Sequence, residues 1–183
     1  MRWILPMIAV ASCSMAAVRA ATGPGSGLED KRMHVETTFK IVVNAPYAET
    51  AKLFGPEGER AWAGKHWDPS FIYPVEARDE QGAVFTIKHG PLNAVWVVAR
   101  HDVDAPHFQY VCFIPDLMVT TIDVRFQSLD PKTTQVTVTY ARTAISPDGE
   151  AHVKAMSEGD RTAGKDWQES IDKYLASQTP ALR

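Results

Sequence analysis

The sequence lacks the motifs that mark the common metal and cofactor chemistries. It has only 2 cysteines in 183 residues, and it contains no Cys-x-x-Cys pair and no His-x-Glu-x-x-His segment of a metal site. A phosphate-binding loop, a dinucleotide-binding glycine fingerprint and a Gly-x-Ser-x-Gly nucleophile motif are absent as well. We therefore expect neither a cofactor nor a metal ion.

Blocks of like charge are missing too. The formal net charge is −3, and no basic cluster appears, which argues against nucleic acid or an anionic lipid surface as a partner. The hydrophobic fraction is 45% and the charged fraction 22%, values that are typical of a soluble globular protein. A chain of this length fits one domain.

The first twenty residues have the pattern of a secretory leader. Arg2 supplies a positive charge, residues 3–10 are apolar, and residues 18–20 offer small side chains at the positions that a signal peptidase reads. We expect a signal peptide over residues 1–20, a flexible linker over 21–31, and a secreted or periplasmic protein. The apolar run is too short for a membrane span, so we expect no transmembrane segment in the mature protein.

Two other interpretations of the N-terminus remain open. Residues 10–13 (Val-Ala-Ser-Cys) resemble a bacterial lipoprotein box, in which Cys13 would be acylated and the glycine-rich linker would be the tether. Alternatively, the protein is cytoplasmic and the start of its coding sequence is assigned incorrectly. Without the leader Cys112 has no disulfide partner, and its strand-like surroundings indicate a buried apolar thiol rather than a nucleophile.

Past the linker, a strand is followed by two short helices. Alternating apolar and polar residues predict the strand over residues 34–43. Asn44 and Pro46 then have the positions of an N-cap and of a first-turn proline, and the Gly-Pro pair at 55–56 ends this helix. A second short helix is expected to follow and to end at Gly64.

Six further segments have the alternation of strands, with turn residues between them, and predict an antiparallel meander. They are residues 71–75, 83–89, 94–102, 108–114, 119–126 and 135–143. Pro74 indicates that the first of these is an edge strand or is bent.

A long amphipathic helix is expected after Ser146 and Pro147. Its apolar residues recur at spacings of three, four or seven and form one stripe: Val153, Met156, Ala163, Trp167, Ile171 and Tyr174. Glycines at 159 and 164 each weaken a helix by about 1 kcal/mol relative to alanine. We therefore expect a bend near Gly159.

This order of elements, together with the segment from Asn44 to Phe54, resembles the START-like superfamily (SRPBCC, polyketide cyclase/dehydrase-like). The resemblance covers residues 33–177. It implies an α+β helix-grip fold, in which a curved antiparallel sheet wraps around the C-terminal helix, with a domain over 32–178 and a tail over 179–183. The segment beginning at Gly58 (Gly-Glu-Arg-x-Trp, then Trp-Asp-Pro) is similar to a subgroup of small bacterial proteins and transfers no catalytic assignment.

A helix-grip sheet encloses either a packed core or a cavity, and alternation predicts which strand residues face inward. With two indoles from the segment 59–69 and one from the long helix, the expected ligand-binding residues are Trp62, Trp67, Phe85, Ile87, His89, Trp96, Val98, Arg100, Tyr110, Cys112, Val138, Tyr140, Arg142 and Trp167. Two plainer interpretations stay open: the strand residues form only a hydrophobic core, and the first two indoles only pin a loop by packing.

Two arginines in this set need a partner if they are buried. For Arg100 and Arg142 the partner is either a protein carboxylate, with Asp102 and Asp116 as the expected ones, or an anionic group of a ligand.

The resemblance implies binding of a small hydrophobic or amphipathic molecule, lipid-like or aromatic. The leader pattern and the missing catalytic motifs lead us to expect an exported binding protein rather than an enzyme. The first alternative is a cofactor-free cyclase, dehydratase or hydrolase, with His89, Tyr110 and Tyr140 as acid/base groups and Arg100 stabilising an anion. The second is a protein-interaction module of the chaperone-activator type, for which a filled interior and an exposed apolar patch would be expected.

Overall fold

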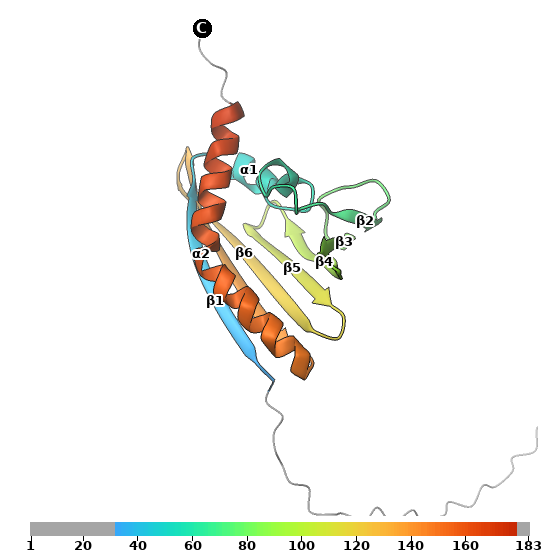
Figure 1. Ribbon diagram of the computed structural model, residues 1–183. Coiled ribbons are helices and arrows are strands. Elements are labelled where there is room, and N and C mark those ends of the chain that lie inside the picture. Colours follow the sequence, from blue (N-terminus) through green and yellow to red (C-terminus); the bar gives the residue numbers. More distant parts are fainter. Residues whose placement is uncertain (1–31, 179–183) are drawn as a thin grey trace, which may run out of the picture. The chain divides into compact units, whose positions relative to one another are not determined.

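The computed structural model describes residues 32–178 and contains one seven-stranded antiparallel sheet with a long C-terminal helix (Figure 1). The strands are β1 (His34–Val43), β2 (Ser70–Tyr73), β3 (Val84–His89), β4 (Leu92–Asp102), β5 (His107–Ile114), β6 (Met118–Asp130) and β7 (Thr133–Ala144). Their order is β1-β7-β6-β5-β4-β3-β2. The expected leader, linker, acylation site at Cys13 and C-terminal tail lie outside the described residues.

Period-two alternation sets the inner face of the sheet, as expected for strands with one face covered. In β6, alternate residues from Met118 to Phe126 are buried, and in β7 the same holds from Thr134 to Val138. The register pairs Val124 with Val138, so inward residues of neighbouring strands meet side by side. These residues form the core beneath α2 (Pro147–Gln178).

The long helix lies across the sheet and contacts β1 most closely. A Cβ at Gly164 would lie 3.1 Å from Phe39, so glycine allows the helix to approach the strand. Gln168 accepts a hydrogen bond from the backbone N–H of Val42 and donates one to its carbonyl, both at 2.8 Å. Figure 1 shows α2 changing direction near its middle, as the glycine at 159 predicts.

The two short helices of the prediction are present as α1 (Tyr47–Thr50), which continues into η1 (Ala51–Leu53), and η2 (Gly58–Ala61). The expected N-cap at Asn44 is wrong. Pro46 is the N-cap residue and no side chain caps the helix. Proline fixes the extended entry into the helix by its ring, so the side-chain cap is not needed to set the direction of the chain.

The second short helix packs directly on the first. A Cβ at Gly58 would lie 2.2 Å from the carbonyl oxygen of Lys52, so only glycine permits this approach. The carboxylate of Asp79, from the connection between β2 and β3, accepts hydrogen bonds from the backbone N–H groups of Glu57 at 2.7 Å and Gly58 at 3.0 Å. This contact holds the start of η2 in place and determines where the next residue, Glu59, points.

One inward assignment is overturned by a β-bulge. The register between β4 and β5 shifts between Val98 and Arg100, so one extra residue reverses the alternation. Arg100 is therefore exposed, whereas the expectation placed it inside. His101 takes the inward phase instead and stacks on Phe108, with 4.2 Å between ring centroids.

Candidate functional site

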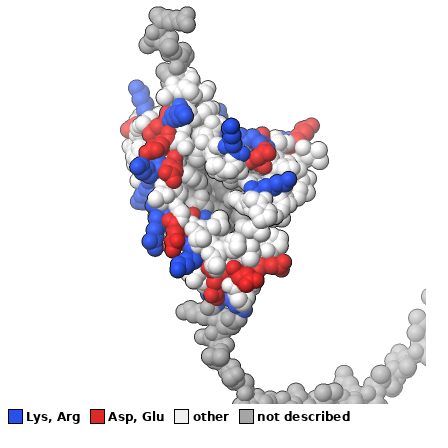
Figure 2. Space-filling view, in the orientation of Figure 1, with Lys and Arg blue, Asp and Glu red and all other residues white. Residues whose placement is uncertain are grey.

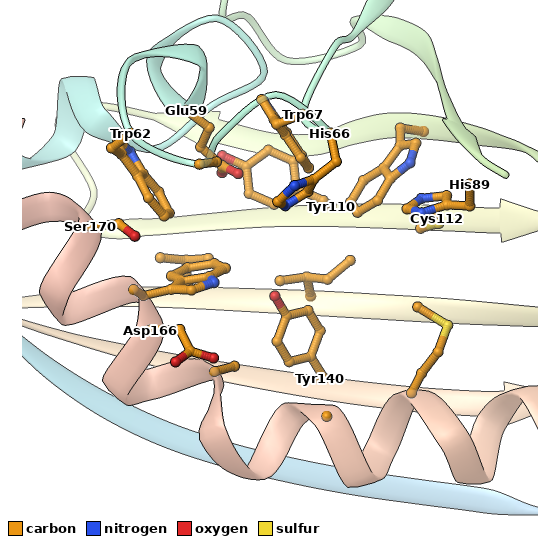
Figure 3. A pocket seen from close by; sticks show the side chains of 18 of the residues that line it. Glu59, Trp62, His66, Trp67, His89, Tyr110, Cys112, Tyr140, Asp166 and Ser170 are labelled. Atoms are coloured by element: carbon orange, nitrogen blue, oxygen red, sulfur yellow. The ribbon is translucent and has the colours of Figure 1, made fainter.

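A cavity of about 400 Å³ lies between the concave face of the sheet, α2 and the segment around η2 (Figure 3). Its walls are formed by Glu59, Trp62, Ala63, His66, Trp67, His89, Trp96, Tyr110, Cys112, Ile122, Val124, Tyr140, Arg142, Met156, Gly159, Ala163, Asp166, Trp167 and Ser170. Figure 2 shows a hollow beside α2 whose visible walls are largely uncharged, while charged side chains gather along the helix. The cavity is of the size that small-molecule sites have.

The structure brings together most of the residues expected to line a cavity. They are Trp62, Trp67, His89, Trp96, Tyr110, Cys112, Tyr140, Arg142 and Trp167. The remaining ones do not line it. Phe85, Ile87, Val98 and Val138 are buried in the hydrophobic core, and Arg100 is at the surface for the reason given above.

Several lining residues were not expected from the sequence, and Glu59 is the most consequential of them. It lies in η2, which is too short to show a hydrophobic period, so no pattern indicated its direction. His66 follows in the next loop, and Asp166 and Ser170 come from α2. The only available signal was the density of aromatic and charged residues over 59–69.

Indole rings form much of the wall, and their own hydrogen bonds hold them there. Trp62 donates from Nε1 to the carbonyl of Leu53 at 2.7 Å, and Trp67 donates to the carbonyl of Pro56 at 2.9 Å. Ring centroids of Trp62 and Trp167 are 5.0 Å apart in an edge contact. The indoles therefore pin the loop after η2 and line the cavity at the same time.

Two polar atoms of the wall have no partner. Trp96 Nε1 and the Tyr110 hydroxyl are buried and make no hydrogen bond to any of the described residues. Buried polar groups in native proteins are nearly always paired, so an exception calls for an explanation. Both side chains line the cavity, although the two polar atoms themselves have almost no accessible surface toward it.

The buried arginine of the wall is already paired. Arg142 donates from Nε and Nη2 to the two carboxylate oxygens of Asp160, both at 2.7 Å, and from Nη1 to Thr120 Oγ1 at 3.1 Å. The expected partners Asp102 and Asp116 are wrong, because the carboxylate comes from α2. A protein carboxylate thus neutralises this guanidinium, which also lies 4.6 Å above the Tyr140 ring.

Glu59 has the most perturbed carboxyl group of the cavity. Its side chain is 7% exposed, and burial raises its pKa from 4.5 to about 8, against a hydrogen bond with the backbone of Gly55 and with a smaller contribution from Asp79. Burial, then the charge of Glu59, raises the pKa of Tyr110 well above its usual value. The carboxyl and the unpaired hydroxyl therefore lie close enough to interact, as Figure 3 shows.

Burial also shifts the pKa values of His89 and Cys112, two further ionisable groups of the wall. Burial lowers the pKa of His89, and the nearby His66 and Arg142 lower it further. Burial raises the pKa of the Cys112 thiol to about 12, so this group is an apolar wall element and has no nucleophilic thiolate near neutral pH.

Within residues 32–178 no three His, Cys, Asp or Glu side chains come together in a way that would hold a metal ion. No helix in this range has the length and hydrophobicity of a membrane span.

Comparison with known proteins identifies the fold. Norcoclaurine synthase from Thalictrum flavum matches with a TM-score of 0.61 at 9% identity, over 91% of this chain and 100% of that chain. The Zhui aromatase/cyclase from Streptomyces sp. R1128 matches with a TM-score of 0.57 at 13% identity, over 82% and 99%. The fold is that of the START-like superfamily. The predicted helix-grip architecture is thereby confirmed.

A further match is a solution structure of a Thermobifida fusca protein, with a TM-score of 0.56 at 15% identity, over 78% of this chain and 95% of that chain. No family model matches the sequence, and the search of curated proteins finds no relative. At these identities the likeness shows the START-like fold alone, so function has to be argued from the cavity.

Proposed function

We propose that this protein binds a small amphipathic molecule, with an aromatic or otherwise apolar body, in the cavity between the sheet and α2. The observation that carries the proposal is a cavity of about 400 Å³ whose wall holds the indoles of Trp62, Trp67 and Trp167 together with a few polar groups. Cavities of this size that are lined mainly by aromatic and apolar side chains, with a few polar groups, are typical sites for small ligands.

The structural neighbours support a small-molecule role for such a cavity. The norcoclaurine synthase structure holds dopamine and hydroxybenzaldehyde, which are both small aromatic compounds. The Streptomyces neighbour is an aromatase/cyclase. An aromatic ligand also suits the indole rings of this cavity, because offset and edge contacts between rings add to the free energy of burial.

The hollow interior argues against the interaction module, which requires a filled one. The enzyme alternative has one observation in its favour, the buried carboxyl of Glu59 beside the hydroxyl of Tyr110. A cofactor-free enzyme would use such a carboxyl as a general acid. Turnover of a bound ligand that disappears in Glu59→Gln while affinity persists would establish this alternative.

The binding proposal can be tested with the neutral fluorescent dye N-phenyl-1-naphthylamine. Ala163 lines the cavity from α2, whereas Ala155 is exposed on the same helix. Ala163→Phe should fill the space and weaken dye binding by roughly tenfold or more, and the matched change Ala155→Phe should leave it unaltered. Absence of dye binding to the wild-type protein, or equal effects of the two changes, would contradict the proposal.

We further propose that the protein is exported, on the basis of the leader pattern in residues 1–20. Intact mass measurement of the protein from its native host tests this. A mature chain that begins at Ala21 supports export by a signal peptide, and an acylated Cys13 supports a lipid anchor. An unprocessed chain in the cytosol would refute export.

A further inference from the structure

The cavity wall holds the buried carboxyl group of Glu59, which forms no ion pair with a Lys or Arg of residues 32–178. Resting on the binding function proposed above, we propose that the ligand carries a protonated amine on an aromatic or apolar body, and that Glu59 is its counter-ion. The ligand would then carry a positive charge, which the apolar cavity by itself does not determine.

The arginines next to Glu59 in the chain and in the cavity wall are already engaged. Arg60 follows Glu59 in the chain, but its Nε donates to Glu57 at 2.7 Å and its Nη1 to Asp68 at 2.8 Å, at the surface. Arg142 is held in a two-oxygen ion pair by Asp160. No lysine is among the residues that line the cavity. Within the described part of the chain, the cavity therefore offers Glu59 no uncommitted Arg or Lys.

Further carboxyl groups lie near that of Glu59. Asp79 lies close enough to raise the pKa of Glu59 by its negative charge. Asp166 lines the same cavity from α2, and Figure 3 places it and Glu59 toward one end, with His89 toward the other. An anionic ligand group would be repelled from the acidic end, whereas a cation is attracted there.

Aromatic rings form much of the cavity wall around Glu59. The faces of tryptophan and tyrosine rings attract organic cations, most strongly where water is excluded. Trp62, Trp67, Trp167 and Tyr110 all line the cavity together with Glu59. The ring of Tyr140, which also lines the cavity, already has a cation beside it, because the guanidinium carbon of Arg142 lies 4.6 Å from the ring centroid. The aromatic rings and the Glu59 carboxyl group together can stabilise an ammonium group that has lost its water shell.

The proton balance of this binding event is defined. With a pKa of about 8, Glu59 is mostly protonated at neutral pH in the empty cavity. When an ammonium group binds, the carboxyl releases its proton to solvent and forms the ion pair, so the ligand keeps its own proton. The titratable groups that surround this event are Asp79, Tyr110, Tyr140, His66 and Asp166.

Isothermal titration of the full chain with three probes of similar size tests the inference. The probes are 2-phenylethylamine, 2-phenylethanol and 3-phenylpropionate, which are cationic, neutral and anionic at pH 7. We expect the amine to bind roughly tenfold or more tighter than the alcohol and the anion to bind weakest. Titrations in phosphate and in Tris, which differ in ionisation enthalpy, should reveal release of close to one proton with the amine and none with the alcohol.

A matched pair of variants locates the effect. Glu59→Gln keeps the shape of the protonated side chain and should remove the preference for the amine while the alcohol binds as before. Glu158→Gln changes an exposed carboxyl of α2 and should alter neither affinity. The wild-type comparison of probes needs no variant, so it remains decisive even if Glu59→Gln folds poorly.

The outcomes separate the two proposals. If the alcohol binds as tightly as the amine without proton release, the ligand is not a cation and this inference is overturned, while the binding function stands. If the anion binds tightest, the inference is overturned in the same way. If none of the three probes and not even the neutral dye binds, both proposals fall.

Discussion

Glu59 should make the stability of this protein depend on pH in a direction opposite to that of most carboxyl groups. A salt-bridged carboxylate stabilises a fold at neutral pH and loses its contribution in acid. Glu59 is instead buried with no cationic partner among residues 32–178, and its pKa in the folded state is raised from 4.5 to about 8. The folded protein therefore holds this proton more tightly than the unfolded chain does.

The size and sign of the effect follow from this difference. Each tenfold difference in proton affinity is worth about 1.4 kcal/mol, so a rise from 4.5 to about 8 corresponds to at most about 5 kcal/mol of folding free energy. The stabilisation is fully present below pH 4.5, declines as the pH rises above it, and is lost once the pH has passed about 8. Above that pH the folded protein contains a buried, unpaired carboxylate.

The perturbation that isolates this effect is Glu59→Gln, because an amide cannot ionise and resembles the protonated acid in shape. As the pH rises from 5 to 9, the free energy of unfolding of the variant should increase relative to that of the wild type by several kcal/mol, and by about 5 kcal/mol at most. Urea denaturation, monitored by tryptophan fluorescence at intervals of one pH unit, measures this difference. Subtracting the two curves cancels the titration of all other groups.

Glu158→Gln is the control, since this carboxyl is exposed on α2, and its curve should run parallel to that of the wild type. If the curve of Glu59→Gln also runs parallel to the wild type from pH 5 to pH 9, Glu59 ionises as freely in the folded protein as in the unfolded chain. The burial argument would then be wrong, and the acid in the cavity could not act as a proton-linked counter-ion.

Three further predictions concern the walls of the cavity. Asp160→Ala should cost about 3–5 kcal/mol by urea denaturation, because it leaves the buried Arg142 guanidinium without its carboxylate, and a loss below 1 kcal/mol would show that water replaces the partner. Tyr110→Phe removes a buried hydroxyl without a partner and should be neutral or stabilise by about 1 kcal/mol in the same assay, whereas destabilisation by 2 kcal/mol or more would mean that the hydroxyl is paired. Arg100→Ala should change stability by less than about 0.5 kcal/mol and leave dye binding unaltered, since the bulge places this side chain in solvent; weaker dye binding would show that Arg100 lines the cavity.

Local patterns in the sequence were sufficient to predict the strands and helices, and the resemblance of their order to a known superfamily supplied the helix-grip architecture. Alternation determined the strands because each has one face covered, and a residue's face then depends only on whether its position is odd or even. The stripe on α2 followed from the helical repeat in the same way. Trp96, Tyr110 and Tyr140 were placed on the inner face by these rules alone, and the structure has all three in the cavity wall.

Tertiary structure decided the chemistry of the cavity. A single extra residue in β4 moved Arg100 to the surface, and no local signal marks such a bulge. Arg142 found its carboxylate on α2, 18 positions away at Asp160, because the packing of helix on sheet and not sequence proximity brings charges together. Glu59 points inward because η2 is packed against Lys52 through a glycine and held by Asp79. Periodic patterns report on which face a residue lies, whereas the ionisation of a buried group depends on neighbours that only the assembled fold supplies.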